Sequence, residues 1–193
     1  MQRDPNATVA ETVFTAFDFE TTGLFPATDR IVEFGGVRFQ DGKILDTFEM
    51  LCNPGIPIGA DAAKVSGICD GDVAGAIPVA EAIPSFIEFV GESVLVAHNA
   101  AFDLGFLRAA AESVGEGEIL NPVVDTQALS IKAFPGKKSY GLQNLAVEFG
   151  FPPNRAHRAL DDAIMCKRLF EHCVEQLSFM GGLELSEVLG AQL

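Results

Sequence analysis

The sequence predicts an α/β domain in which a mixed β-sheet is flanked by layers of helices. The first part of the chain carries hairpin-type strands joined by the turn signal Asp41-Gly42. Farther on, short apolar runs alternate with stretches of helical periodicity, which is typical of strands connected by crossover helices. Apolar residues make up 48% of the 193 residues, enough for one domain with a sizeable core. We expect this domain at residues 12–178, a flexible tail at 1–11 and a C-terminal tail or short helix at 179–193.

Three strands are expected first. Residues 13–19 form an apolar run that ends at Thr21-Thr22-Gly23, and residues 31–40 and 43–52 alternate well enough to form the next two. An antiparallel meander is the simplest arrangement for them. Residues 53–55 (NPG) break the sheet, and a short helix at 60–66 is expected to stop at Gly67.

The second part predicts helices between buried strands. Pro78 stands at a favoured helix start, and the apolar stripe that follows indicates a helix over 78–90. Residues 93–97 are a short apolar run, hence a buried strand, and a helix from Asn99 to Val114 is stopped by Gly115. The remaining expected elements are a strand at 121–125 and helices at 126–134, 142–149 and 158–177.

Charge, cysteine content and hydropathy argue against several classes of protein. The net charge of −14 argues against generic adhesion to a polyanion, although bound divalent metals could supply positive charge locally. Residues 132–158 carry five basic side chains and one glutamate, either a solvated basic face or a local phosphate-facing patch. The four cysteines lack CxxC spacing, as expected of reduced thiols in a cytoplasmic protein. No apolar run reaches the roughly 18 residues of a membrane span, and no signal-peptide core is seen, so we expect no membrane contact.

Asp18 and Glu20 stand out because they interrupt the most apolar strand. Alternate side chains of a strand share a face, so both carboxylates point the same way. Burying unpaired charge is costly, and a cation that prefers oxygen ligands, Mg²⁺ or Mn²⁺, would offset that cost. The alternative is a strand end at which both side chains reach solvent.

Two further carboxylates are turned inward by helical register. Asp103 heads the face of its helix that carries Phe106 and Leu107, although a carboxylate that only stabilises the helix dipole is the alternative. Asp162 shares its face with apolar residues, whereas Asp161 shares a mixed and more polar one. We therefore expect Asp162 to point inward and Asp161 to pair with Arg168 or cap the helix.

His157 precedes Asp162 by five residues, a spacing that separates the two side chains within one regular helix. We place it on the loop before the helix, hanging over the site that Asp162 lines. A surface histidine without a role is the alternative.

Three segments together resemble, in order, the exonuclease motifs of the DnaQ-like family of 3′→5′ exonucleases of the DEDDh type. The resemblance extends over about residues 13–177 and is nearest to the proofreading subunit or domain of bacterial DNA polymerase III. Two shorter segments between the second and third motifs also resemble the family. The motif segments are 18–24 (DFETTGL), 98–103 (HNAAFD) and 157–163 (HRALDDA), and the shorter ones are 124–126 (VDT) and 139–145 (SYGLQNL).

The resemblance implies a ribonuclease H-like fold with a five-stranded mixed sheet, in which parallel strands follow an antiparallel meander. It implies that four carboxylates hold two divalent metal ions, Mg²⁺ or Mn²⁺, and that His157 is the general base. The implied metal ligands are Asp18, Glu20, Asp103 and Asp162. The implied contacts to the 3′-terminal nucleotide are Thr21, Thr22, Gly23, Leu24, Asn99 and Phe102.

The implied activity is release of nucleoside 5′-monophosphates from single-stranded or frayed DNA 3′ ends. Two alternatives stay open at this point. One is an RNA-directed exonuclease of the ribonuclease T or oligoribonuclease type, and the other is a module that mainly binds a polymerase. The expected partners are therefore a DNA or RNA 3′ end and, as a second candidate, a DNA polymerase.

Overall fold

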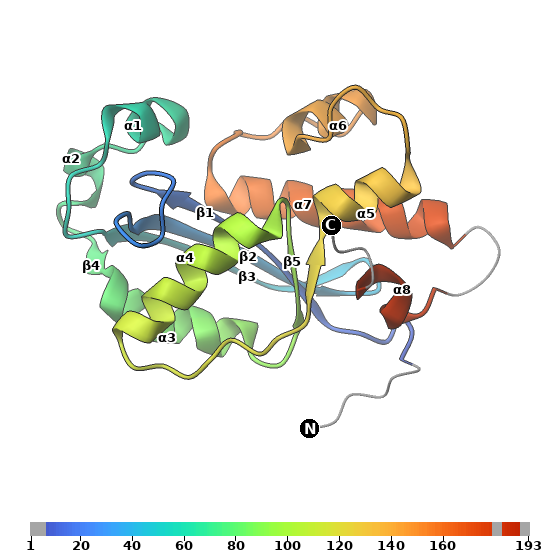
Figure 1. The fold of residues 1–193 in the computed structure, drawn as a ribbon, viewed down its shortest axis with the longest axis horizontal. Coiled ribbons are helices and arrows are strands. Elements are labelled where there is room, and N and C mark those ends of the chain that lie inside the picture. The colour runs from blue at the N-terminus through green and yellow to red at the C-terminus, as the bar shows by residue number, and fades with distance from the viewer. Residues whose placement is uncertain (1–6, 179–182, 190–193) are drawn as a thin grey trace.

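A mixed sheet of six strands, in the order β4-β3-β2-β1-β5-β6, organises the molecule. This is a computed structural model, which describes residues 7–178 and 183–189. Helices α3 and α4 cover one face of the sheet, and α7 with α5 covers the other (Figure 1). The strands are β1 Phe14–Thr21, β2 Ile31–Gln40, β3 Lys43–Asn53, β4 Ile77–Pro78, β5 Val94–Ala97 and β6 Val123–Asp125. The helices are α1 Ala60–Ser66, α2 Asp70–Val73, α3 Val79–Val90, α4 Ala100–Ser113, α5 Thr126–Ala133, α6 Leu142–Glu148, α7 Ala159–Leu177 and α8 Leu185–Leu189.

The predicted mixed sheet is confirmed, with one strand more than expected. Strands β1, β2 and β3 form the antiparallel meander, and β5 and β6 continue the sheet in parallel beyond β1. The additional strand is β4, which pairs with β3 only at Cys52 and Asn53. Two residues carry no alternation, and periodicity assigned Pro78 to the start of the next helix instead.

The predicted helices are present, and a single turn, α2, was missed. Its four residues are too few to show helical periodicity. Local hydrogen bonding forms it instead, because the Asp72 carboxylate accepts from the backbone N–H of Cys69 at 2.8 Å. Among the described residues, no helix combines the length and apolar character that a membrane crossing needs.

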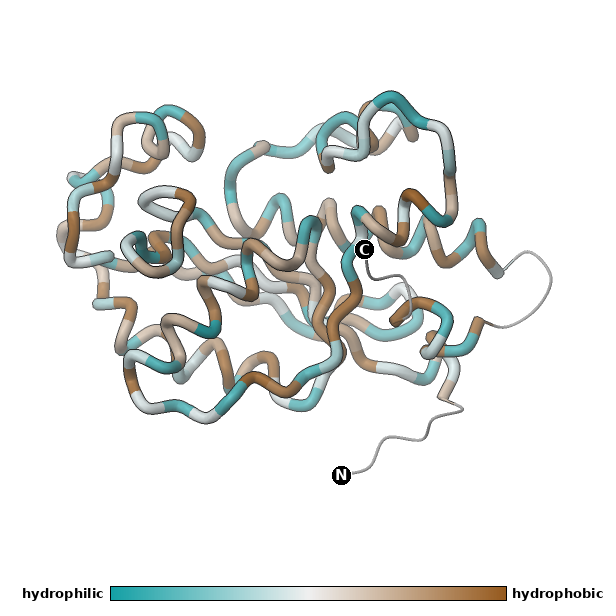
Figure 2. The backbone as a smooth tube through the Cα atoms, in the orientation of Figure 1, coloured by the Kyte–Doolittle hydropathy of each residue, from teal (hydrophilic) through white to brown (hydrophobic). Residues whose placement is uncertain are grey.

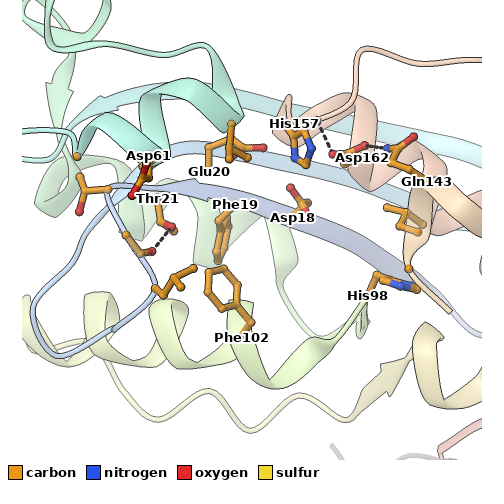
Figure 3. Close-up of a pocket in the computed structure, with 18 of the residues that line it drawn as sticks. Asp18, Phe19, Glu20, Thr21, Asp61, His98, Phe102, Gln143, His157 and Asp162 are labelled. Carbon is orange, nitrogen blue, oxygen red and sulfur yellow. Dashed lines mark hydrogen bonds between the residues drawn. The ribbon is translucent and has the colours of Figure 1, made fainter. Parts of the chain in front are cut away.

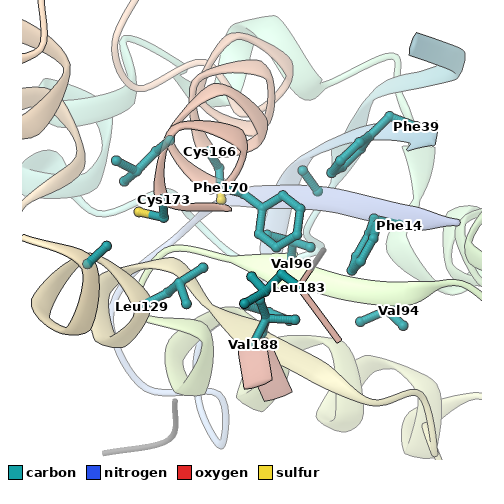
Figure 4. Close-up of a cluster of buried hydrophobic side chains, with 14 of the residues drawn as sticks. Phe14, Phe39, Val94, Val96, Leu129, Cys166, Phe170, Cys173, Leu183 and Val188 are labelled. Carbon is teal, nitrogen blue, oxygen red and sulfur yellow. The ribbon is translucent and has the colours of Figure 1, made fainter. Parts of the chain in front are cut away.

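Strand β1 divides its side chains between two phenylalanine-rich cores. Phe17 and Phe19 pack with Phe86 on the α3 side. On the α7 side, Phe14 packs against Phe39 and Phe170 (Figure 4). Hydrophobic residues accordingly concentrate along the central strands (Figure 2). Because of the alternation, the α7-facing side of β1 changes from apolar to acidic as the strand proceeds.

The described terminal segments lie together at the end of the sheet remote from the acidic residues. Thr8 bridges to Glu184, and the Val9 N–H donates to the Leu183 carbonyl at 3.1 Å. In α8, Leu185 and Val188 are buried in the core beneath α7. The expected tail at 1–11 and the segment 179–193 fall partly on residues outside the described ranges.

Gly35 lets the first turn of α7 approach the sheet. It pairs with Asp18 in the adjacent strand, and a Cβ built on it would lie 2.0 Å from the backbone carbon of Ala159. Any side chain at this position would therefore displace the helix that carries Asp162.

We expect Gly35→Ala to lower the free energy of unfolding by about 2 kcal/mol or more, as overpacking of a tight contact does. Urea denaturation would measure the change. The matched control is Gly117→Ala, because a Cβ at Gly117 meets nothing within 4 Å. Equal stability of the two variants would contradict the close approach.

Candidate active site

The acidic end of β1 opens into a cavity of about 900 Å³. Its wall combines ionisable and apolar side chains from β1, α1, α4, α6 and α7 (Figure 3). Asp18, Glu20, His157 and Asp162 lie near one another, and Phe102 lies farther along the wall (Figure 3). Leu24 and Val65 are further apolar residues of the lining. The cavity thus joins a charged region to an apolar one.

Asp103 lies behind the cavity wall, where it takes the place of a strand partner for β1. Parallel pairing of β1 with β5 ends at Ala16, so the N–H of Phe19 has no strand partner there. Asp103, in the first turn of α4, accepts that N–H at 3.1 Å and is 3% exposed. The inward register predicted for Asp103 brings its charge next to Asp18 rather than into the cavity lining.

The acidic residues raise one another's proton affinity. Burial, followed by the charges of Asp103 and Asp162, raises the pKa of Asp18 well above its ordinary value. Burial and the charge of Asp162 raise the pKa of Glu20 to about 8. Burial also raises the pKa of Asp103 to about 7, against the hydrogen bond from Phe19. A bound cation would favour the ionised forms of these carboxylates.

The residues present fit a divalent metal of the Mg²⁺ or Mn²⁺ type. Ligand atoms of Glu20, His157 and Asp162 lie within 4.8 Å of one another. Carboxylate oxygens are the ligands that these hard cations prefer, and Asp18 adds another on the same face of β1 as Glu20. The chemistry of the donor set and the raised pKa values therefore point to the same group.

His157 lies on the loop before α7, exposed and with a left-handed backbone (φ 62°). Its N–H donates to Asp162 Oδ2 at 2.8 Å, which accounts for the unusual conformation. Asp161 behaves differently from its neighbour, since it accepts from Arg155 Nε at 2.8 Å. The predicted partner Arg168 was wrong, because the loop before α7 brings Arg155 to this carboxylate instead. The structure thus brings Asp162 to the cavity and leaves Asp161 in a peripheral ion pair.

Five of the six residues expected to contact a nucleotide line the cavity, and Asn99 does not. Asn99 is exposed and left-handed (φ 63°), and its N–H donates to Asp125 at 3.2 Å. The same carboxylate accepts from the N–H groups of Ala100 and Gln127, so it caps the starts of both α4 and α5. Within segment 98–103, Asn99 therefore helps to fix the start of α4, the helix that carries Asp103. The five in the wall are Thr21, Thr22, Gly23, Leu24 and Phe102.

Glu33, which sequence reasoning missed, fastens α7 to the sheet. It lies opposite Glu20 in the β1–β2 register and is 0% exposed. Arg158 donates to it from Nε at 3.1 Å and from Nη2 at 2.5 Å, and the Ala159 N–H donates at 2.9 Å. A glutamate within the apolar run 31–34 was the available signal, by the same reasoning that singled out Asp18.

The basic stretch at 132–158 is largely used within the fold. Lys137 pairs with Glu148 at 2.7 Å, Arg155 with Asp161, and Arg158 with Glu33. Lys132 donates to the Glu187 carbonyl. In the described ranges this leaves Lys138 with neither an ion pair nor a hydrogen bond from its ammonium group, so the stretch does not form a continuous free basic face.

A second histidine, His98, also lines the cavity but is tied into the fold. Its Nε2 donates to the Tyr140 carbonyl at 2.8 Å, and its Nδ1 lies 3.0 Å from Thr126 Oγ1. Burial lowers the pKa of His98, which favours the neutral form of the ring. His98 therefore links the end of β5 to the loop that leads into α6.

A ribonuclease H-like sheet with an acidic cavity at the end of its central strand defines the class as a nuclease. The family model described as Exonuclease, of the RNase T type, matches residues 15–170. The chain belongs to this exonuclease family and is homologous to the epsilon subunit of DNA polymerase III.

Two relatives illustrate the similarity. The DNA polymerase III subunit epsilon of Treponema pallidum is 42% identical over 159 residues, which cover 81% of this chain and 74% of that protein. The PolC-type DNA polymerase III of Caldanaerobacter subterraneus is 39% identical over 175 residues, or 91% of this chain. The chain spans only 12% of that polymerase.

Solved exonuclease structures share the fold. Exonuclease X in complex with 5′ overhanging duplex DNA has a TM-score of 0.72 at 25% identity, covering 92% of this chain and 98% of that one. E. coli exonuclease I in complex with a dT13 oligonucleotide has a TM-score of 0.73 at 18% identity, covering 88% of this chain and 41% of the other.

Two glutamates lie near the guanidinium of Arg158, and we expect them to contribute differently to the free energy of unfolding. Glu33→Gln leaves a half-buried guanidinium without its partner, and we expect it to lower the free energy of unfolding by about 3 kcal/mol. Glu49 lies 3.8 Å from the same guanidinium and is 45% exposed, so Glu49→Gln should cost less than about 1 kcal/mol. Urea denaturation of both variants measures the difference. Similar losses would show that Glu33 contributes no more than a surface charge.

The raised pKa values predict that metal-free protein loses stability as pH rises. A carboxyl that titrates at about 8 when folded, against an ordinary 4.5, binds more protons in the folded state between those values. Stability therefore falls over that interval, by about 1.4 kcal/mol for each unit of pKa shift at one group. Thermal unfolding in EDTA at pH 5 and pH 8 would measure the trend. Glu20→Gln should flatten it, and a stability that rises equally in both proteins would contradict it.

Proposed function

We propose that residues 12–178 form a divalent-metal-dependent 3′→5′ exonuclease domain. It hydrolyses phosphodiester bonds at single-stranded or frayed DNA 3′ ends and releases nucleoside 5′-monophosphates. The observation that carries this proposal is the group of mutually repelling carboxylates at the head of the cavity, with His157 beside them. Such a group is costly to fold unless it binds cations.

The roles follow from position. Asp18, Glu20, Asp103 and Asp162 would hold two divalent ions, which when bound stabilise the attacking and leaving oxygens of a phosphodiester displacement. His157 is exposed and has a ring nitrogen within 4.8 Å of the Glu20 and Asp162 oxygens, so it can accept a proton from a water in the site.

The apolar part of the wall supports binding of an unpaired 3′ terminus. Leu24 is 70% exposed and Val65 54% exposed, and both line the cavity with Phe102. Apolar and aromatic surfaces stack with any base, which suits a nuclease without sequence preference. The loop beneath Leu24 is fixed, because the Asp29 carboxylate accepts from the Phe25 N–H at 2.9 Å.

DNA is the favoured substrate, with RNA as the alternative. The relatives are named as subunits of DNA polymerase III, and solved structures of the same fold hold DNA. The same names support a DNA polymerase as a partner, or as the remainder of a longer chain. In either setting the activity would serve proofreading.

Adjacent aspartates provide a matched test of the proposal. Asp162→Asn removes a proposed metal ligand and should lower the cleavage rate at least about 100-fold, the upper range for weakened metal sites. Asp161→Asn changes the neighbouring carboxylate, which pairs with Arg155, and should keep most of the activity. The assay follows 5′-labelled single-stranded DNA with Mn²⁺, and shortening from the 3′ end gives a ladder of products.

Matched RNA and DNA oligonucleotides in the same assay decide the substrate, with EDTA as the metal control. Full activity in Asp162→Asn protein or in EDTA would overturn the metal mechanism. Faster cleavage of RNA would replace DNA by RNA as the substrate.

A further inference from the structure

Asp162 differs from the other proposed metal ligands in the number of hydrogen bonds that it accepts. Gln143 Nε2 donates to its Oδ1 at 2.6 Å, and Asn154 Nδ2 donates to the same oxygen at 2.7 Å. The His157 N–H donates to Oδ2 (Figure 3). Within residues 7–178, the carboxylates of Asp18 and Glu20 accept no hydrogen bond, and that of Asp103 accepts one from another residue, Phe19.

Counting lone pairs shows what remains for a metal. A carboxylate oxygen has two lone-pair sites, so the two amides use both sites of Oδ1. The backbone N–H uses one site of Oδ2 and leaves one. The ligand with the most donors around it therefore has a single position open.

We propose that Gln143 and Asn154 are positioning residues that make Asp162 a one-oxygen ligand, in which only Oδ2 binds a divalent ion. This inference rests on the proposed metal-dependent function. The two amides lock the rotation of the carboxylate, and because they are neutral they add no charge that competes with the cation. Lysine or arginine at either position would hold Asp162 equally well but would repel the metal.

Each donor comes from an element that is itself held in place. Gln143 lies in the first turn of α6, and the loop before it is tied to His98 through the Tyr140 carbonyl. Asn154 lies on the loop that the Arg155–Asp161 pair fastens to α7. The orientation of Asp162 thus depends on the start of α6 and on the loop that precedes α7.

The alternative hypothesis is that the amides compete with the metal for the carboxylate. The two hypotheses predict opposite changes in metal affinity when an amide is removed. If the amides position Asp162, their removal weakens metal binding. If they compete, their removal strengthens it.

The test is Mn²⁺ binding, measured by electron paramagnetic resonance on wild type and Gln143→Met. We expect the Kd of the variant to rise about tenfold or more, the range for lost partners of metal ligands. Cleavage should fall at low Mn²⁺ and recover at high Mn²⁺, which a purely structural defect would not do. Asn154→Ala should act in the same direction. The control is Gln176→Met on the exposed side of α7, which should bind Mn²⁺ like wild type.

Thermal unfolding shows whether each variant is folded. A folded Gln143→Met protein with a Kd within twofold of wild type, or a lower Kd, would overturn the inference. If this variant does not fold, Asn154→Ala and the shorter Gln143→Asn decide by the same criterion. Absence of Mn²⁺ binding in wild type would instead overturn the proposed function, and the inference with it.

Discussion

The concentration of buried acidic groups at the end of β1 is the constraint on which the rest of the structure depends. Five carboxylates gather there, and the fold treats one of them differently. Glu33 is neutralised by Arg158 and by a backbone N–H, so it serves as an internal ion pair. Asp18 and Glu20 form no ion pair within the described residues and keep raised pKa values, although the charge of Arg158 partly lowers that of Glu20. The fold thus stabilises one carboxylate with its own charge and leaves the others to a ligand of opposite charge.

The surrounding elements can be understood as means of bringing those groups together. Strand β5 pairs with only the first part of β1, which leaves the Phe19 N–H for Asp103. Gly35 has no side chain, which allows the start of α7 to lie against β2 and deliver Asp162. Asp125 caps two helices at once and fixes the direction of α4. Each of these contacts joins segments that are distant in the sequence, so the geometry of the site is a property of the whole sheet.

The difference between local periodicity and contacts between distant elements explains what the sequence could predict. Periodicity within one element located the strands, placed Asp18 and Glu20 on one face, and separated Asp162 from Asp161. The partners that hold these groups come from other elements, and periodicity carries no information on such contacts. Glu33 was visible as a charge in an apolar strand, but its role depends on Arg158, 125 positions away. Gln143 and Asn154 gave no local signal, because a polar side chain near a turn looks the same whether it faces solvent or a carboxylate.

Several basic side chains near the site are paired within the fold and are therefore not free to bind the phosphates of a substrate. Arg155, Arg158 and Lys137 are engaged by acidic side chains, on a chain whose net charge is −14. Proteins that bind nucleic acid through many lysine and arginine contacts lose affinity steeply as salt rises. Here the positive charge would come from metal ions at the carboxylates, and the remaining affinity from stacking on Leu24, Val65 and Phe102. Affinity for a 3′ end should therefore depend more on divalent metal than on ionic strength, which suits an enzyme that acts on chain ends and not along the strand.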